Sequence, residues 1–166
     1  AITGAKDASK TWSKTTAKQR VALIEEIAER LEGRADEFAK IEALDTGNTV
    51  GPMTNDVHKA VERMRFYCGL AYELKGMTVP STPENIHLTL REPYGVVGRI
   101  IPYNHPIGFA ASRIAPALIA GNTIVVKPSE QAPLSASLLA EICAELAPPG
   151  VINIVTGDRT TGEVLV

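Results

Sequence analysis

The chain has 166 residues, of which 45% are hydrophobic and 22% charged, so it is long enough for one globular domain with an appendage. Its net charge of −2 gives no reason to expect nucleic acid or an anionic membrane surface as a partner. No apolar run approaches the roughly 18 residues of a membrane span, and the first residues lack the basic segment and apolar core of a signal peptide. We therefore expect neither a membrane anchor nor export.

Three helical patterns occupy residues 1–75, which we predict as an N-terminal helical segment. Thr16 and Gln19 form a capping box that opens the first helix, a second is expected over 35–44, and a third over about 55–74. The apolar residues that recur at helical spacing, and are therefore predicted to face inward, are Val21, Leu23, Ile24, Ile27, Ala28 and Leu31 in the first helix, Phe38, Ile41 and Leu44 in the second, and Val57, Ala60, Val61, Met64, Cys68, Ala71 and Leu74 in the third.

The two cysteines, Cys68 and Cys143, belong to no CxxC motif and no Cys/His cluster. Both fall inside helical patterns, which favours buried thiols over reactive ones. The sequence therefore predicts no metal site, and it favours a reducing, cytoplasmic location.

Residues 76–92 have the pattern of a β-hairpin. Short strands over 78–80 and 86–91 flank a turn, and apolar and polar residues alternate along the second strand. The alternation predicts one exposed face and one face packed on another surface, such as a partner subunit, because an isolated hairpin is marginally stable. We interpret this segment as an oligomerisation element.

Residues 93–166 alternate between strand and helix. Continuous apolar runs over 95–101, 123–126 and 151–155 predict buried strands, and helical patterns over 109–120 and 134–146 connect them. This order predicts an α/β fold, in which a partial Rossmann-like parallel sheet is covered by helices on both faces. Ligands of such sheets bind beyond the C-terminal ends of the strands, so this segment is predicted to be an incomplete dinucleotide-binding domain.

Three loops follow these strand ends, and the second of them carries Lys127 and Glu130. A carboxylate can accept hydrogen bonds from both hydroxyls of a nucleotide ribose, and a lysine beside it can donate hydrogen bonds to the sugar or to a phosphate. A 2′-phosphate would be repelled by Glu130 but attracted by Lys127, so the pair favours NAD over NADP only weakly. The alternative is a solvated Lys/Glu pair at a helix start.

The third loop, from Gly157 to Gly162, is a weaker candidate for contacting a phosphate. It lacks the G-x-G-x-x-G spacing, and no Lys-Ser or Lys-Thr follows its second glycine. From these residues alone, an ordinary turn between a strand and a helix is the better explanation.

The first loop places Asn104 between Pro102 and Pro106, and the two rings restrict where its amide points. A held amide is a good donor to a developing oxyanion, although a turn asparagine bonding its own backbone is the common alternative. His105 has no carboxylate partner in the neighbouring sequence, so we do not expect a catalytic role for it.

Taken together, the motifs of this half resemble the aldehyde dehydrogenase superfamily in order and spacing. The segments that carry the resemblance are Glu92-Pro93-Tyr94-Gly95-Val96-Val97-Gly98, Ile101-Pro102-Tyr103-Asn104-His105-Pro106, Ala120-Gly121-Asn122-Thr123, Val126-Lys127-Pro128-Ser129-Glu130 and Pro148-Pro149-Gly150-Val151-Ile152-Asn153, and Leu44-Asp45-Thr46-Gly47 agrees less sharply.

The resemblance implies a role for several residues. Asn104 matches the oxyanion-stabilising asparagine, and Lys127 and Glu130 match the residues that hold the adenosine ribose of NAD, with NADP as the other possible cofactor. Further residues fall beside the cofactor: Ile100, Ile101, Pro102, Tyr103 and Ser129, together with Gly157 and Gly162 in the cofactor loop, where Arg159 stands at a position that is usually glycine.

In the family, a cysteine thiolate attacks the aldehyde to give a thiohemiacetal, and a glutamate activates the hydrolytic water. Both lie downstream of the segments matched here, so the resemblance implies the N-terminal part of an NAD(P)-dependent aldehyde oxidiser that is inactive by itself. It also implies a small-molecule aldehyde as substrate and a homodimer or homotetramer. Two alternatives are a truncated, non-catalytic nucleotide-binding or interaction module and a related acyl-phosphate or CoA-linked reductase.

Overall fold

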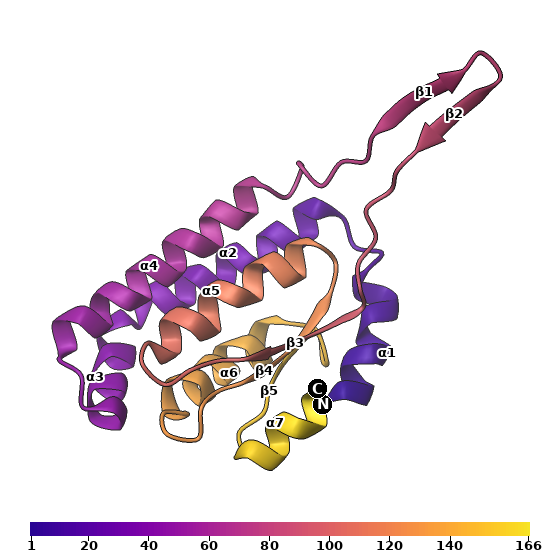
Figure 1. Cartoon of the computed structure of the whole chain (residues 1–166). Coiled ribbons are helices and arrows are strands. Elements are labelled where there is room, and N and C mark those ends of the chain that lie inside the picture. The colour runs from indigo at the N-terminus through magenta and orange to yellow at the C-terminus, as the bar shows by residue number, and fades with distance from the viewer.

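The computed structural model describes all of residues 1–166, as seven helices and five strands (Figure 1). In chain order these are α1 (Ile2–Trp12), α2 (Ala17–Gly33), α3 (Ala35–Thr46), α4 (Val50–Gly69), β1 (Thr78–Thr82), β2 (Asn85–Leu88), β3 (Val96–Ile100), α5 (Pro106–Ile119), β4 (Thr123–Lys127), α6 (Leu134–Leu146), β5 (Ile152–Ile154) and α7 (Arg159–Leu165). None of the helices has the length and apolar character that a membrane crossing requires.

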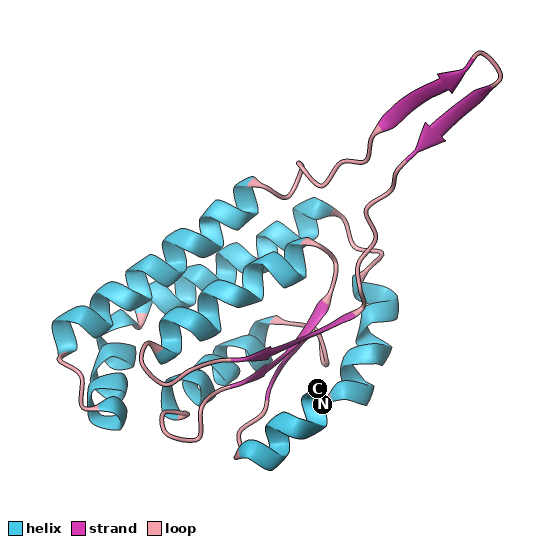
Figure 2. Cartoon of the chain, in the orientation of Figure 1, coloured by secondary structure: helices cyan, strands magenta, loops and turns pink.

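The long helices α2, α4 and α5 pack side by side and enclose most of the core (Figure 2). The predicted capping box is present: Thr16 Oγ1 accepts from the Gln19 N–H, and the Gln19 side chain accepts from the Thr16 N–H. The predicted stripe is buried from Val57 to Cys68 on α4 and at Ala71 just beyond its end. The helical periodicity of the sequence therefore identified the packed face of both helices.

Four details of the helical segment differ from the prediction. Helix α1 was not predicted, because its N-terminal residue caps nothing and only two of its side chains are buried. Helix α4 begins earlier, since Pro52 fits in a first helical turn, and it ends at Gly69, which leaves Leu74 49% exposed. The prediction that Leu44 faces inward was wrong: it is 86% exposed, and Glu42 is buried instead.

Strands β1 and β2 form an antiparallel hairpin that extends away from the rest of the molecule (Figure 1). Every residue of both strands is exposed, including Val79, Ile86 and Leu88. The hairpin itself was predicted, but no element of this chain packs on its apolar face.

Strands β3, β4 and β5 form a parallel sheet in that order, as the alternation of strand and helix predicts. Successive residues of β4 point to opposite faces. Ile124 and Val126 join the core under α5 and α6, whereas Thr123 faces α1, where its hydroxyl donates to the Ala5 carbonyl. Helices therefore cover both faces, as Figure 1 shows.

The prediction that all three strands are buried holds only for β4, whose five residues are all buried. Strand β3 lies at the edge of the sheet, and two of its residues, Gly98 and Ile100, are exposed. The segment from Gly157 to Gly162 is also not one loop, because α7 begins at Arg159 and includes Gly162.

Candidate functional site

The C-terminal ends of the three parallel strands are held at one edge of the sheet. The Ile101 N–H donates to the Lys127 carbonyl at 3.0 Å, and the Val155 N–H donates to the Val126 carbonyl at 2.9 Å. The loops that follow the strands therefore start next to one another, as predicted from the topology.

A hollow of about 540 Å³ opens between this edge and α7. It is lined by Ile100, Lys127, Asp158, Arg159, Gly162, Glu163 and Val166. At Gly162, α7 lies next to the sheet edge, because a Cβ atom there would be in van der Waals contact, at 3.7 Å, with both Ile100 Cδ1 and Lys127 Cδ. The structure thus brings together three of the predicted cofactor residues, Ile100, Lys127 and Gly162.

Lys127 is only 5% exposed, and its ammonium group donates to the Pro128 carbonyl at 3.1 Å. Glu130 lies in the exposed turn that follows and forms no ion pair with Lys127. The alternative of a solvated Lys/Glu pair is therefore wrong. An ammonium group has three donors, so Lys127 retains donors for a ligand in the hollow. Ser129 is used locally, since its hydroxyl accepts from the Gln131 N–H at 3.2 Å.

Gly157 and Asp158 form the short turn between β5 and α7. Gly157 has φ of 142°, and a Cβ atom there would lie 2.1 Å from Thr161 Oγ1. Asp158 caps α7 by accepting from the Thr160 and Thr161 N–H groups. Gly157 is thus required by the turn itself, whereas a Cβ atom at Gly162 would make only ordinary van der Waals contact with the sheet.

The loop after β3 leads from the buried Ile101 to the exposed residues Pro102, Tyr103 and Asn104. The side-chain amide of Asn104 forms no hydrogen bond within the chain. The alternative of a turn asparagine bonded to its own backbone is therefore wrong, and the amide can donate to a ligand beside the sheet edge.

His105 does have a carboxylate partner, contrary to the prediction from local sequence. Its Nδ1 lies 2.5 Å from Oδ2 of Asp56, which projects from α4. The 49 residues between the two explain why the neighbouring sequence gave no signal of the pair.

Sequence reasoning missed a second acid, Glu42, which is fully buried under the site. Its Oε1 accepts from the Ile107 N–H at 2.5 Å, in the first turn of α5, and from Ser135 Oγ of α6 at 2.8 Å. Burial raises the pKa of Glu42 above its ordinary value. One carboxyl group of α3 therefore fixes the starts of both helices that follow the site loops.

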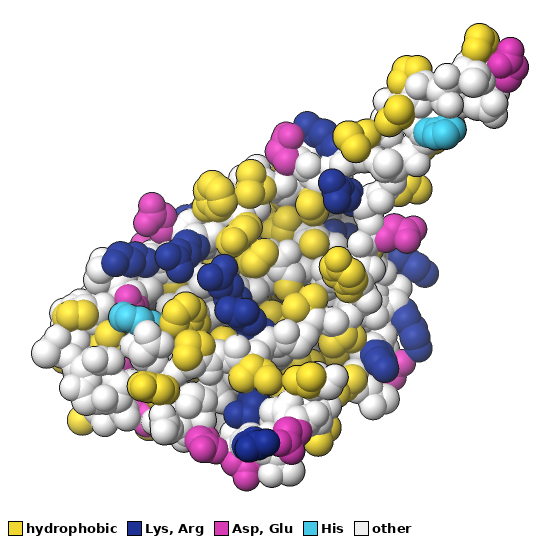
Figure 3. Space-filling view, viewed as in Figure 1, with side chains coloured by type: hydrophobic (Ala, Val, Ile, Leu, Met, Phe, Trp, Pro, Cys, Tyr) yellow, Lys and Arg dark blue, Asp and Glu magenta, His cyan; other side chains and the backbone are white.

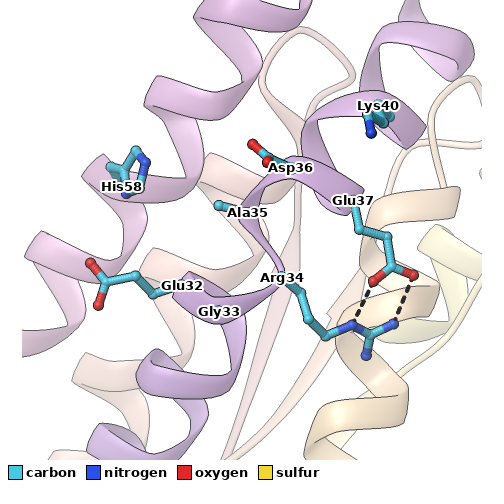
Figure 4. Close-up of a pocket in the computed structure, with 8 residues that line it drawn as sticks. All are labelled: Glu32, Gly33, Arg34, Ala35, Asp36, Glu37, Lys40 and His58. Atoms are coloured by element: carbon cyan, nitrogen blue, oxygen red, sulfur yellow. Dashed lines mark hydrogen bonds and ion pairs between the residues drawn. The ribbon is translucent and has the colours of Figure 1, made fainter.

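A more polar hollow, of about 590 Å³, lies where α2 ends and α3 begins (Figure 4). Arg34 and Glu37 form a bidentate ion pair along one side of the hollow, with donor–acceptor distances of 2.8 and 3.0 Å. His58 is exposed and lies away from that pair (Figure 4). The lining side chains do not converge on one point, so the hollow is not a candidate catalytic centre.

Neither cysteine contributes a nucleophile to the site, as predicted from the helical pattern. Burial raises the pKa of each thiol, Cys68 and Cys143, to about 12. At pH 8 only roughly one thiol in 10,000 would be ionised. We expect an aromatic disulfide reagent to label neither cysteine in the folded chain within minutes and both in urea. Rapid labelling of the folded chain would contradict the assignment.

Comparison with known proteins gives a consistent result. A model of the "Aldehyde dehydrogenase family" matches residues 1–166. The chain is 39% identical to "Aldehyde dehydrogenase tropH" of Talaromyces stipitatus over 99% of its own length and 33% of that protein. It is also 38% identical to an aldehyde dehydrogenase of Rhodospirillum rubrum, over 95% of this chain and 31% of that protein.

Solved structures agree with these matches. HpcC from Thermus thermophilus superposes with a TM-score of 0.93 at 40% identity, over 98% of this chain and 32% of that one. PnpE in complex with nicotinamide adenine dinucleotide superposes with a TM-score of 0.92 at 36% identity, over 99% of this chain and 34% of that one. A structure of PnpE from Pseudomonas sp. WBC-3 superposes with a TM-score of 0.93 at 36% identity, over 99% of this chain and 34% of that one. The chain therefore spans about a third of the length of the relatives that it matches.

Proposed function

This chain belongs to the aldehyde dehydrogenase family, and we propose that it is the N-terminal part of an enzyme that oxidises an aldehyde to a carboxylic acid with NAD(P)+. The observation that carries the proposal is the arrangement at the sheet edge. A buried lysine faces a hollow closed by Gly162, and an asparagine amide without a partner lies on the adjacent loop.

The residues at the edge fit a nicotinamide dinucleotide. When bound, this cofactor supplies the acceptor for the aldehyde hydride. Lys127 would donate to the ribose or a phosphate, and Glu130 would accept from the ribose hydroxyls. The other predicted contacts would come from the Ile100–Tyr103 segment, Ser129 and the turn at Gly157. Since Glu130 would repel a 2′-phosphate, we propose NAD as the preferred cofactor.

Asn104 would donate its amide hydrogen to the oxygen of the aldehyde as negative charge develops there. The attacking thiolate and the glutamate that activates water would come from sequence outside the matched segment, since neither Cys68 nor Cys143 is accessible. We propose that the 166 residues alone therefore do not oxidise aldehydes. The gene sequence after Val166 tests this reading: a strand ending in a glycine pair and a Gly-x-Cys loop would support it, and a stop codon would favour a non-catalytic nucleotide-binding module.

The exposed hairpin β1–β2 is the proposed element of oligomerisation. It presents Val79, Ile86 and Leu88 to solvent on strands that no other part of the chain covers. Burial of such apolar side chains against a second subunit would offset their exposure. We propose a homodimer or homotetramer.

The cofactor site can be tested on the chain itself by calorimetry with NAD. We expect Glu130→Ala to weaken NAD binding about ten-fold, because two hydrogen bonds to a charged acceptor would be lost. The matched control is Gln131→Ala, which alters the next exposed side chain of the same turn. Equal affinities of the original chain and Glu130→Ala would contradict the assignment of Glu130.

A further inference from the structure

A groove between α4 and α5 begins one residue beyond Asn104. It has a volume of about 230 Å³, and the side chains that define its character are Lys59 and Arg63 from α4, His105 just before α5, and Phe109 from α5. The His105 and Phe109 rings pack edge to face, with centroids 6.3 Å apart. The groove thus combines two aromatic rings next to the asparagine with two cations from α4.

The cations of the groove have no acidic partner within the chain. Lys59 and Arg63 lie one helical turn apart, both are exposed, and neither forms an ion pair. By contrast Arg65, on another side of the same helix, contacts both Glu25 and Glu32.

The only acid that lines the groove, Asp56, is engaged by His105. Figure 3 shows a row of Lys and Arg side chains over α4 and α5. The groove therefore has a net positive charge, and a negative charge inside it would be attracted.

We propose that this groove binds an anionic group of the substrate, a carboxylate or phosphate at the far end of a short aldehyde. The proposal rests on the proposed function and specifies its substrate class. With the carbonyl beside Asn104, the carbon chain would lie against Phe109 and the anion between Lys59 and Arg63. Hydrogen bonds between ionised partners are short and strong, so the two cations select substrates by charge.

The test compares pairs of aldehydes that differ in the anionic group, using the complete enzyme that contains this chain. The pairs are 4-oxobutanoate with butanal and glyceraldehyde 3-phosphate with glyceraldehyde, and the readout is kcat/KM from NADH formation. We expect kcat/KM to be at least ten-fold higher for an anionic aldehyde than for its neutral partner. Whichever pair shows the larger ratio identifies carboxylate or phosphate as the preferred group.

The variants Lys59→Met and Arg63→Met remove one charge each and keep most of the side-chain length. Each is expected to lower kcat/KM for the anionic aldehyde about ten-fold and to leave the neutral aldehyde within two-fold. Lys18→Met, at an exposed lysine of α2 without an ion pair, is the control. Equal kcat/KM within both pairs, or an equal loss for charged and neutral aldehydes in the variants, would overturn the proposal.

A binding measurement on the chain separates this proposal from the proposed function. Succinate titrated into the 166-residue chain should shift the NMR signals of His105 and Phe109, and these shifts should be lost in Lys59→Met/Arg63→Met. If no aldehyde is oxidised but succinate binds in this way, the anion subsite stands and the oxidoreductase proposal fails. Absence of the shifts in the original chain counts against the subsite, whatever the enzyme does.

Discussion

Replacing Asn104 by alanine in the complete enzyme is expected to lower kcat for aldehyde oxidation roughly 100- to 1000-fold, which is the usual cost of losing one oxyanion donor. The amide is exposed and bonded to nothing within the chain, so no local structure depends on it. The free energy of unfolding should therefore change by less than about 0.5 kcal/mol. Steady-state NADH formation and urea unfolding measure the two effects separately.

The size of the effect follows from where the donor acts. A hydrogen bond that strengthens as the carbonyl oxygen becomes negative stabilises the transition state more than the bound aldehyde, so kcat falls and KM changes little. Asn48→Ala, which removes an exposed asparagine far along the chain from the sheet edge, is the control for the substitution itself. A loss in kcat of less than about five-fold in Asn104→Ala would show that the oxyanion is held by another donor.

The sequence predicted those parts of the site whose residue pattern lies within one short stretch of the chain. Strand β4 and helix α6 were predicted from uninterrupted apolar and helical patterns. Asn104 lies in the loop after β3 and Lys127 ends β4, so the order of the strands fixes the edge on which the two meet. Lys127 could not be predicted to be buried, because its burial depends on the approach of α7 at Gly162.

The residues that were missed act across long stretches of chain. Glu42 bonds to residues 65 and 93 positions away, and Asp56 pairs with a histidine 49 positions away. A carboxylate within an amphipathic helix ordinarily belongs to the solvated face, which is why Leu44 rather than Glu42 was predicted to face inward. Only the position of α3 against the starts of α5 and α6 makes a buried acceptor favourable there.

The alternation in the hairpin and the continuous apolar run of β3 correctly marked apolar side chains but not what covers them. Periodicity records that one face of a strand is apolar, whereas burial depends on a second surface. In this chain no element packs on the hairpin, and β3 lies at a sheet edge. The hairpin therefore formed where predicted but is exposed, and β3 formed where predicted but is only partly buried.

Replacing Glu42 by alanine is expected to lower the free energy of unfolding by about 2–4 kcal/mol. The substitution leaves the Ile107 N–H at the start of α5 and the Ser135 hydroxyl of α6 without their acceptor in a site closed to water. Each unsatisfied buried group costs roughly 1–3 kcal/mol, and loss of a helix cap alone costs about 1 kcal/mol. Urea unfolding followed by circular dichroism measures the change. A loss below about 1 kcal/mol would mean that water or a local shift replaces the carboxyl group.

Glu42→Gln is the matched control, because the amide keeps an acceptor for both donors and cannot ionise. Burial raises the pKa of Glu42 in the folded chain above the ordinary 4.5, so the folded state binds a proton to higher pH than the unfolded state does. The stabilisation that the folded chain gains by keeping Glu42 protonated is therefore fully present below the pKa of Glu42 in the unfolded chain. It is lost as the pH rises through the pKa of Glu42 in the folded chain. We expect the free energy of unfolding of the original chain to fall relative to that of Glu42→Gln as the pH rises from 4 to 8, with the two closest at acid pH. Parallel pH profiles would show that Glu42 is ionised in the folded state at its ordinary pKa, and the raised pKa would then be wrong.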